Sequence, residues 1–181
     1  TPFDKILGVS NLDMLRYEWI WEKTRATGFL NARKMPMKAH ENILIFYNKL
    51  PKYHPQMSHG HPRKISTAQH KQHCLKGDCY GQYGLSSYDS TDRYPRSILK
   101  GPTEKEKGQT LTARKPVWLC RYLIETYTDP GDLVLDCCMG TGAIGEAAVG
   151  TGRKFIGMEL DRERFQEAKN RITLVQQENN R

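Results

Sequence analysis

The chain has 181 residues and carries 28 Lys and Arg residues against 20 Asp and Glu, which gives a formal net charge of +8. The length suits one ordinary domain, and because no apolar run approaches about 20 residues, no membrane-spanning helix is predicted. The start lacks the basic and then apolar opening of a signal peptide, and the five cysteines do not resemble a disulfide framework, so we expect a reducing, cytoplasmic location. The adjacent Cys137 and Cys138 resemble small core residues rather than nucleophiles.

The positive charge is concentrated in the first part of the chain. Residues 1–110 contain 18 basic and ten acidic residues, whereas residues 111–181 contain ten of each. This asymmetry favours a polyanionic partner, above all nucleic acid, for the first part. A solvated basic surface would have the same composition, so charge alone leaves both interpretations open.

Residues 1–50 contain two short segments rich in aromatic and β-branched residues, at 17–21 and 43–47, and both predict strands. Trp19 and Trp21 are expected on alternate faces, as core and sheet cover. The basic segment 25–36 between the strands is broken by Gly and Pro and predicts a loop. Phosphate contacts are expected from the basic side chains in and around this loop, with solvated charge as the alternative: Arg25, Arg33, Lys34 and Lys38.

Residues 51–110 show no sustained helical or strand period, which predicts an irregular functional insertion. Aromatic and basic residues alternate in Tyr88, Arg93, Tyr94 and Arg96. Rings that can stack, beside cations that can meet phosphates, suit nucleic acid, so we expect Arg93 and Arg96 to contact it. The same mixture of residues could serve only to anchor a loop.

The same region contains the pattern H-x-x-H-C-x4-C, formed by His70, His73, Cys74 and Cys79. Four nitrogen and sulfur ligands could hold a structural zinc ion. The spacing is not that of a standard zinc finger, and histidines in a DNA-facing loop need no metal. We therefore predict no metal site, with structural zinc as the alternative.

Residues 111–181 are strongly periodic. A helix is predicted to open at Lys115 and Pro116, because apolar residues follow at helical spacing and Pro suits the first turn of a helix. Alternating helices and strands then predict an α/β unit with a parallel strand pair. The elements after the first helix are a buried strand at 133–135, a glycine loop at 140–145 with a helix at 143–149, a strand at 154–159 and a final helix from 162.

Gly140, Gly142 and Gly145 satisfy the pattern G-x-G-x-x-G, and Glu159 stands nineteen residues after the first of them. This pattern is typical of dinucleotide sites, but Asp136 at the strand end would repel a pyrophosphate and attract an amine. S-adenosylmethionine has an amine and no phosphate. We therefore expect this cofactor, with the glycines against its methionine part and Glu159 on its ribose hydroxyls. A nicotinamide or flavin site and a purely structural turn are the alternatives.

The segment Leu135–Gly142 resembles the cofactor motif of S-adenosylmethionine-dependent DNA amino-methyltransferases, which methylate adenine N6 or cytosine N4. Residues 155–161, the helix start at 115–116 and the strand segments 17–23 and 38–44 are similar to further segments of bacterial and phage members, as found in restriction-modification systems. This order of motifs is that of the β class. The resemblance implies a Rossmann-like methyltransferase fold and a cofactor site at the matching positions: Lys115, Pro116, Asp136, Met139, Gly140, Gly142 and Glu159.

The resemblance also implies a division of the chain. Residues 1–50 would supply strands and a basic loop of the methyltransferase domain, residues 51–110 the target-recognition region, and residues 111–181 the cofactor-binding α/β unit. The implied function is site-specific methylation of double-stranded DNA, with adenine N6 preferred over cytosine N4.

The family's catalytic motif, which is Asp, Asn or Ser followed by Pro-Pro and then Tyr or Phe, occurs nowhere in the chain. That motif supplies the acceptors and the aromatic ring that position a flipped base. No catalytic residue is therefore predicted, and the fragment is expected to be inactive alone; a non-catalytic DNA-binding remnant is the alternative. The resemblance places the missing strands in the middle of the sheet, so we expect a split sheet that a second chain or a swapped copy completes.

Overall fold

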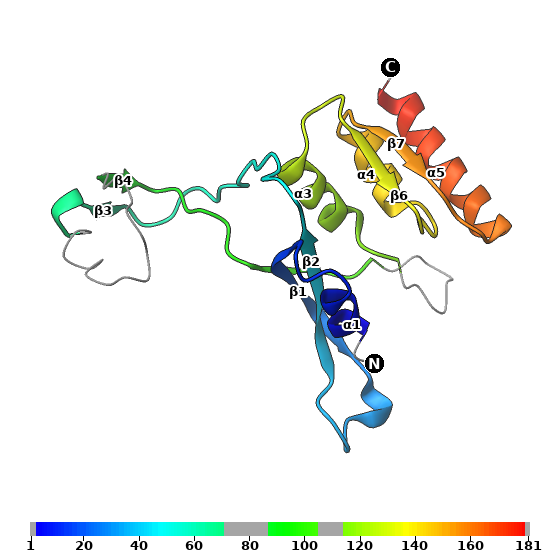
Figure 1. Ribbon diagram of the computed structural model, residues 1–181, viewed down its shortest axis with the longest axis horizontal. Coiled ribbons are helices and arrows are strands. Elements are labelled where there is room, and N and C mark those ends of the chain that lie inside the picture. The colour runs from blue at the N-terminus through cyan, green and yellow to red at the C-terminus, as the bar shows by residue number, and fades with distance from the viewer. Residues whose placement is uncertain (1–2, 71–86, 105–113, 180–181) are drawn as a thin grey trace. The chain divides into compact units, whose positions relative to one another are not determined.

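The computed structural model describes residues 3–70, 87–104 and 114–179, and the chain divides into two compact units (Figure 1). One unit is formed by Thr1–His54 together with Arg96–Arg181, and the other by Pro55–Pro95. The described helices include none that is long and apolar enough to cross a membrane. The elements in chain order are α1 (Phe3–Val9), β1 (Leu15–Thr27), η1 (Phe29–Asn31), β2 (Lys38–Phe46), β3 (Lys64–Ser66), β4 (Tyr88–Ser90), β5 (Ile98–Gly101), α3 (Val117–Tyr127), β6 (Leu133–Asp136), α4 (Ala143–Gly150), β7 (Lys154–Gly157) and α5 (Arg162–Asn179).

A long antiparallel hairpin of β1 and β2 forms the first sheet of the larger unit, and β5 joins β1 in parallel to give the order β2-β1-β5. Both strands were predicted, and both are confirmed. They are longer than expected, because backbone pairing continues past the aromatic segments as far as Thr27 opposite Lys38. The prediction of a loop from residue 25 onward is therefore wrong for residues 25–27.

The two tryptophans of β1 lie on the same face of the sheet, which corrects the expectation that they alternate. Trp19 is 4% exposed and Trp21 is 2% exposed, and both rings meet α3, through Tyr122 and Trp118 respectively. Residues two apart in a strand project to the same side. Because Trp19 Nε1 also donates to the Tyr127 hydroxyl at 2.7 Å, this face fixes α3 on the hairpin sheet.

The α/β unit of residues 114–179 has the predicted order of helix, strand, helix, strand and helix, with β6 and β7 paired in parallel. Its core is formed by small and medium-sized side chains from α3 and α4: Cys120, Ile124, Ala143, Ala147 and Ala148. Alanines allow the helices to approach closely, and Val134 and Phe155 pack on this core from the strands. One face of the strand pair is thus covered by helices.

The described residues form separate small sheets and not one continuous sheet. A split sheet is what the resemblance led us to expect. The pairs are β2-β1-β5, β3-β4 and β6-β7, and within the described parts β2 and β6 each pair on one side only. Leu133, Leu135 and Ile156 lie on the face of β6 and β7 opposite the helices and are 58%, 61% and 47% exposed. Parallel strands are normally covered on both faces, so this side of the unit is incomplete.

The smaller unit contains the antiparallel pair β3 and β4, which corrects the expectation of a region without regular elements. Three-residue strands are too short for a period of two to be visible in the sequence. Arg63 spans the pair and donates two hydrogen bonds to the Asp89 carboxylate, at 2.7 and 2.6 Å. The boundaries predicted for the recognition region stay predictions.

Candidate cofactor and nucleic-acid sites

The carboxyl ends of β6 and β7 bring the predicted cofactor residues together in one loop system. Asp136 ends β6 and accepts a hydrogen bond from the Cys138 N–H at 3.0 Å, while its carbonyl accepts from the Met158 N–H at 2.9 Å. The Met139 N–H donates in turn to the Met158 carbonyl at 2.9 Å. The loop after β6 is therefore tied to the chain that leaves β7, and the Asp136 carboxylate is held at the loop's start.

The two glycines of the loop have left-handed backbone conformations, with φ of +52° at Gly140 and +84° at Gly142. A Cβ atom at Gly142 would stand 2.8 Å from the Ala168 Cβ, so a side chain there would push α5 away. A Cβ atom at Gly140 would meet nothing within 4 Å. Gly142 is thus required by packing, whereas Gly140 faces open space of the kind that a bound ligand could fill.

Glu159 follows β7 and is bonded to the same loop. Its Oε1 accepts from the Asp161 N–H at 3.0 Å, and its Oε2 accepts from the Gly140 N–H at 2.8 Å. These N–H groups, Asp161 first, hold the pKa of Glu159 below its ordinary value. The carboxylate is therefore ionised at neutral pH, and each of its oxygens keeps a lone pair for hydroxyl donors.

Lys115 and Pro116 lie at the start of α3, which packs against α4 directly after the glycine loop. Pro116 is fully buried, and its carbonyl accepts the N–H groups of Leu119 and Cys120 at 3.1 and 3.2 Å. Arg114 donates to Glu146 on α4 at 2.5 Å, which fastens the start of α3 to the first turns of α4. The structure thus brings both predicted residues to the helix that borders the loop.

A carboxylate that the sequence did not single out as a site residue links the hairpin to α3. Glu41 on β2 accepts from Lys23 on β1 at 2.8 Å and from Lys115 at 2.7 Å, and the Lys23 side chain is only 8% exposed. Burial raises the pKa of Glu41, but the hydrogen bonds from Lys115 and Lys23 outweigh it and keep the pKa below its ordinary value. An ion-pair network therefore joins β1, β2 and the start of α3.

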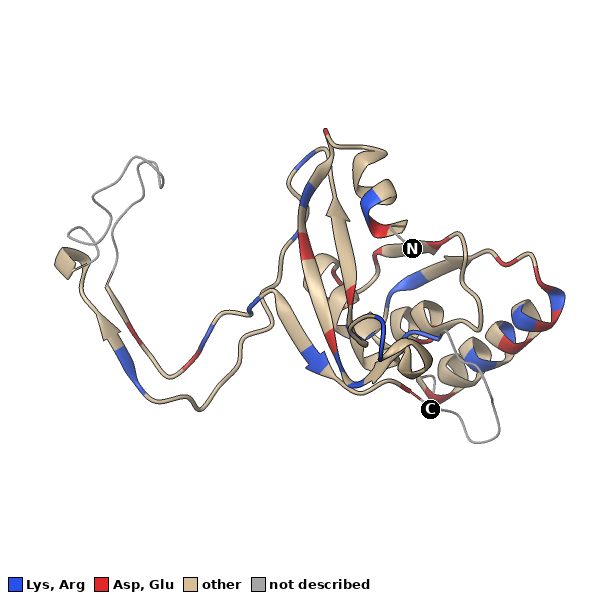
Figure 2. Cartoon of the chain, turned by 90° about the horizontal axis from the view of Figure 1, so that it is seen from below, with Lys and Arg blue, Asp and Glu red and all other residues tan. Residues whose placement is uncertain are grey.

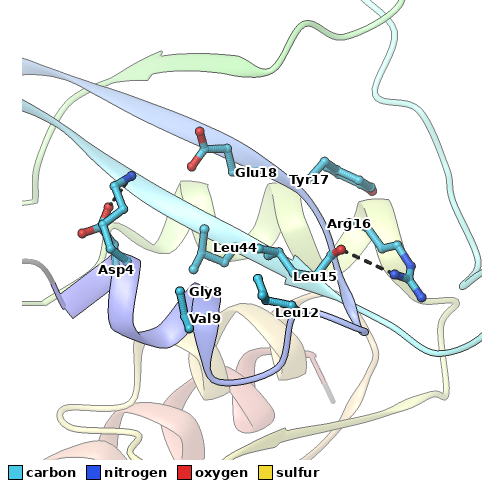
Figure 3. A pocket seen from close by; sticks show the side chains of 10 residues that line it. Asp4, Gly8, Val9, Leu12, Leu15, Arg16, Tyr17, Glu18 and Leu44 are labelled. Carbon is cyan, nitrogen blue, oxygen red and sulfur yellow. Dashed lines mark hydrogen bonds and ion pairs between the residues drawn. The ribbon is translucent and has the colours of Figure 1, made fainter.

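Glu41 and Lys115 border a pocket of about 290 Å³ between the hairpin, α3 and α4. Glu41, Asn42 and Lys115 supply its polar atoms, and the rest of the lining is largely apolar. Cys120 is part of the lining, and burial raises the pKa of its thiol to about 12, so it stays a thiol and serves as a small core residue. A second pocket, of about 370 Å³, lies between α1 and the base of the hairpin (Figure 3), away from the predicted cofactor residues.

The adjacent cysteines of the loop do not occupy the position expected of them. Cys137 and Cys138 were expected to be small core residues, but both are exposed. The strand ends at Asp136, and the chain then turns into the loop rather than back into the core. Both are free thiols.

Four of the six predicted DNA contacts lie on the hairpin. Arg25, Arg33, Lys34 and Lys38 are all exposed, and within the described residues none of them takes part in an ion pair. Residues 24–40, which contain all four, include no Asp or Glu (Figure 2). This end of the hairpin is therefore a group of unneutralised cations.

The remaining two candidates differ from one another. Arg96 is exposed at the chain's return to the larger unit. The Arg93 guanidinium instead donates to the carbonyl oxygens of Ser90 at 3.1 Å and Asp92 at 2.7 Å, and to that of Pro62. A DNA contact by Arg93 stays a prediction, and the observed hydrogen bonds give it a structural role within its own unit.

The possible zinc ligands lie mostly outside the described residues, because only His70 of that pattern belongs to them. Elsewhere in the described part of the chain, no group of three or more His, Cys, Asp or Glu side chains is arranged to hold a metal ion. A structural zinc ion at this pattern therefore remains an untested alternative.

Comparison with known proteins gives a family match over residues 5–170, to the family described as DNA methylase. The chain is 42% identical over 55 residues to the type II methyltransferase M.BglI of Bacillus subtilis, which is 30% of this chain and 16% of that protein. It is 42% identical over 50 residues to the DNA adenine methyltransferase YhdJ of Escherichia coli K12, covering 28% and 17% of the two chains. The matched segments span less than a third of these relatives.

Solved structures show the same fold. The crystal structure of the M1.HpyAVI–SAM complex has a TM-score of 0.57 at 22% identity, covering 93% of this chain and 68% of that chain. The PvuII DNA methyltransferase, described as cytosine-N4-specific, has a TM-score of 0.60 at 18% identity, covering 98% of this chain and 62% of that chain. The mixed α/β architecture of this chain thus matches about two thirds of the length of each of these two structures.

Proposed function

Since the chain belongs to the DNA methylase family, we propose that it is part of a site-specific DNA methyltransferase that uses S-adenosylmethionine. The observation that carries the proposal is the loop after β6, where hydrogen bonds hold the Asp136 and Glu159 carboxylates and a Cβ atom at Gly140 would meet nothing within 4 Å. Adenine N6 is our preferred target over cytosine N4, on the overall likeness of the sequence motifs; relatives described as adenine-specific and as cytosine-N4-specific both occur.

The residues present fit this cofactor. We assign the amino group of the methionine part to the Asp136 carboxylate, its backbone to the space at Gly140, and the ribose hydroxyls to Glu159, with Met139, Gly142, Lys115 and Pro116 completing the site. When bound, S-adenosylmethionine supplies an electrophilic methyl group to an exocyclic amine of a base. The residues of this chain bind and orient the cofactor, and the base must be held by a catalytic segment that the chain does not contain.

Cofactor binding by the 181-residue chain tests this assignment directly. The substitution Asp136→Asn keeps the side-chain shape and the acceptor for Cys138 but removes the charge. We expect titration calorimetry to show a loss of S-adenosylmethionine affinity of about tenfold or more, because a hydrogen bond to a charged group contributes about 1.5–3 kcal/mol. The matched control is Asp13→Asn, which makes the same change at an exposed position before β1. Unchanged affinity in Asp136→Asn would refute the assignment of the site.

We propose double-stranded DNA as the partner of the basic part of the chain. Support comes from the uneven charge, the exposed cations of the hairpin and the family to which the chain belongs. The alternative, a non-catalytic DNA-binding remnant, would bind DNA but would not methylate it in any combination with other segments. Cytoplasmic localisation is proposed on the free, exposed thiols of Cys137 and Cys138.

We further propose that a second polypeptide or a swapped copy completes the sheet. The strands β2 and β6 offer unpaired edges within the described residues, and Leu133, Leu135 and Ile156 form an uncovered apolar face. α1, which contacts β2, also carries exposed apolar side chains, namely Phe3, Ile6 and Val9. An exposed edge beside an apolar face favours pairing with further strands.

A further inference from the structure

The end of the β1–β2 hairpin combines exposed positive charge with exposed apolar side chains. It carries the four exposed cations described above, and between them it presents large apolar side chains to solvent. Phe29 is 77% exposed and Leu30 is 95% exposed, whereas Met35 is 58% exposed. Single exposed apolar residues are common, but a group of them surrounded by cations marks an interaction surface.

The exposure of Phe29 and Leu30 results from an ordered turn. Figure 1 shows η1 at the end of the hairpin. Gly28 enters η1 with φ of +91°, a conformation that favours glycine, and its carbonyl accepts from the Asn31 N–H at 3.0 Å. The Phe29 carbonyl accepts from the Ala32 N–H at 3.0 Å, and Lys34 and Met35 both donate to Asn31. The backbone bonds are satisfied locally, so the two side chains are held outward in advance of any contact.

We propose that Phe29 and Leu30 form a wedge that enters the base stack of a DNA duplex, while the surrounding cations hold the flanking phosphates. Charge complementarity selects a polyanion, because residues 24–40 contain four basic and no acidic residues. Among polyanions, a duplex offers an apolar interior between base pairs, and Phe and Leu wedges at basic surfaces unstack such steps. The proposal rests on the proposed function as far as DNA binding is concerned, and deepens it by assigning the means of opening the stack.

The wedge has a role that suits methylation of an exocyclic amine. A base within a duplex must leave the stack before its amine can be attacked, and the unstacking costs a few kcal/mol. A phenyl ring and an isobutyl group in the vacated space would restore part of the lost stacking and keep water out of it. Phe29 and Leu30 are thus assigned to positioning the DNA and not to the transfer itself.

The test titrates the full 181-residue chain into a duplex that contains 2-aminopurine, whose fluorescence rises when it is unstacked. We expect a severalfold rise with the native sequence. In the variant with Phe29→Ala and Leu30→Ala we expect most of that rise to be lost and the affinity to fall about 5- to 100-fold, as for lost base stacking, with the salt dependence unchanged. Leu174→Ala, at an exposed position on α5, is the control and should behave as the native chain.

A second variant separates the wedge from the charges. With Arg33→Ala and Lys34→Ala we expect weaker binding and a slope of log affinity against log salt that is smaller by about 2, while the fluorescence rise at saturation is kept. If the Phe29 and Leu30 variant binds and brightens the duplex like the native chain, the wedge is overturned and DNA binding stands. If the native chain binds no DNA, the proposed partner itself is overturned. Binding to anionic lipid vesicles in place of DNA, lost in the same variant, would overturn both in favour of a membrane surface.

Discussion

At the scale of single residues, the proposed cofactor site rests on two carboxylates at the ends of neighbouring parallel strands. Asp136 accepts one backbone N–H, whereas both oxygens of Glu159 accept N–H groups from the loops around them. Glu159 is therefore tied to the conformation of the glycine loop before any ligand binds. In the proposed cofactor site, Glu159 would hold the loop as well as a ligand, whereas Asp136 would mainly supply charge.

The hydrogen bonds between Glu159 and the surrounding loops predict a lowered pKa for its carboxyl group, which can be measured. The N–H groups of Asp161 and Gly140 stabilise the charged form, so NMR titration of the Glu159 carboxyl carbon should give a pKa below its ordinary value of 4.5. A pKa for Glu159 at or above the ordinary value would show that the hydrogen bonds from Asp161 and Gly140 are not kept in solution.

Sequence spacing was enough to predict some of these residues and not others. Asp136, Gly140 and Glu159 follow strand ends at spacings that the fold fixes, so the pattern points to them directly. Glu41 acquires its role from Lys23 and Lys115, which are far from it in sequence, and no local pattern reports such a contact. The exposure of Cys137 and Cys138 was missed because their small apolar character resembles that of core residues.

At the scale of secondary-structure elements, the ion-pair network of Glu41 predicts how the hairpin and α3 are held together. The substitution Glu41→Gln leaves the nearly buried ammonium of Lys23 without a charged acceptor. We expect the free energy of unfolding in urea to fall by about 1–3 kcal/mol. The control is Glu22→Gln on β1, which breaks an exposed pair with Lys100 and should cost less than about 1 kcal/mol. Equal losses in the two variants would contradict a special role for Glu41.

The same network has a predictable dependence on pH. The pKa of Glu41 is lower in the folded chain than its ordinary value of 4.5, so its stabilising contribution is fully present above that value. The contribution is lost as the pH falls through the lower pKa of the folded state. The difference in stability between the native chain and Glu41→Gln should therefore be constant near neutral pH and should narrow below about pH 4.5. A difference that grows on acidification would contradict this assignment.

Elements were predictable where they are long or strongly periodic. The helices and the parallel strands of residues 114–179 follow from apolar spacing, and the structure agrees on their order. The short strands β3, β4 and β5 carry no period, and β5 depends on pairing with β1, which precedes it by more than 70 residues. α1 was missed because seven residues with largely exposed apolar side chains give no amphipathic pattern.

At the scale of the whole molecule, the uncovered face of β6 and β7 and the open strand edges predict association. We expect light scattering to find the isolated 181-residue chain in self-associated form rather than as a monomer, because apolar side chains and unpaired backbone groups remain accessible. A monomer that unfolds cooperatively and contains one uninterrupted sheet would contradict the proposed completion.

Complementation extends this prediction to activity. A separate polypeptide that carries an Asp-Pro-Pro-Tyr segment with its strands should join the chain and enable transfer of a labelled methyl group to DNA. The chain alone should be inactive, and the Asp136→Asn chain with the same polypeptide serves as the control, with transfer greatly reduced at low cofactor concentration. Association without any methyl transfer would favour the binding remnant over the enzyme.

The chain on either side of residues 55–95 is held by hydrogen bonds and ion pairs within the larger unit. Before the segment, the His54 N–H donates to the Thr126 carbonyl at 2.8 Å, and the Lys52 ammonium binds the carboxylates of Asp129 and Asp132 at 2.7 Å each. After the segment, the Ser97 carbonyl accepts from the Ile20 N–H at 2.8 Å. None of these interactions involves a side chain or backbone group of residues 55–95. If this segment reads the DNA and the loop after β6 binds S-adenosylmethionine, as we propose, then variation between the two anchoring points should change the preferred DNA sequence without changing the use of the methyl donor.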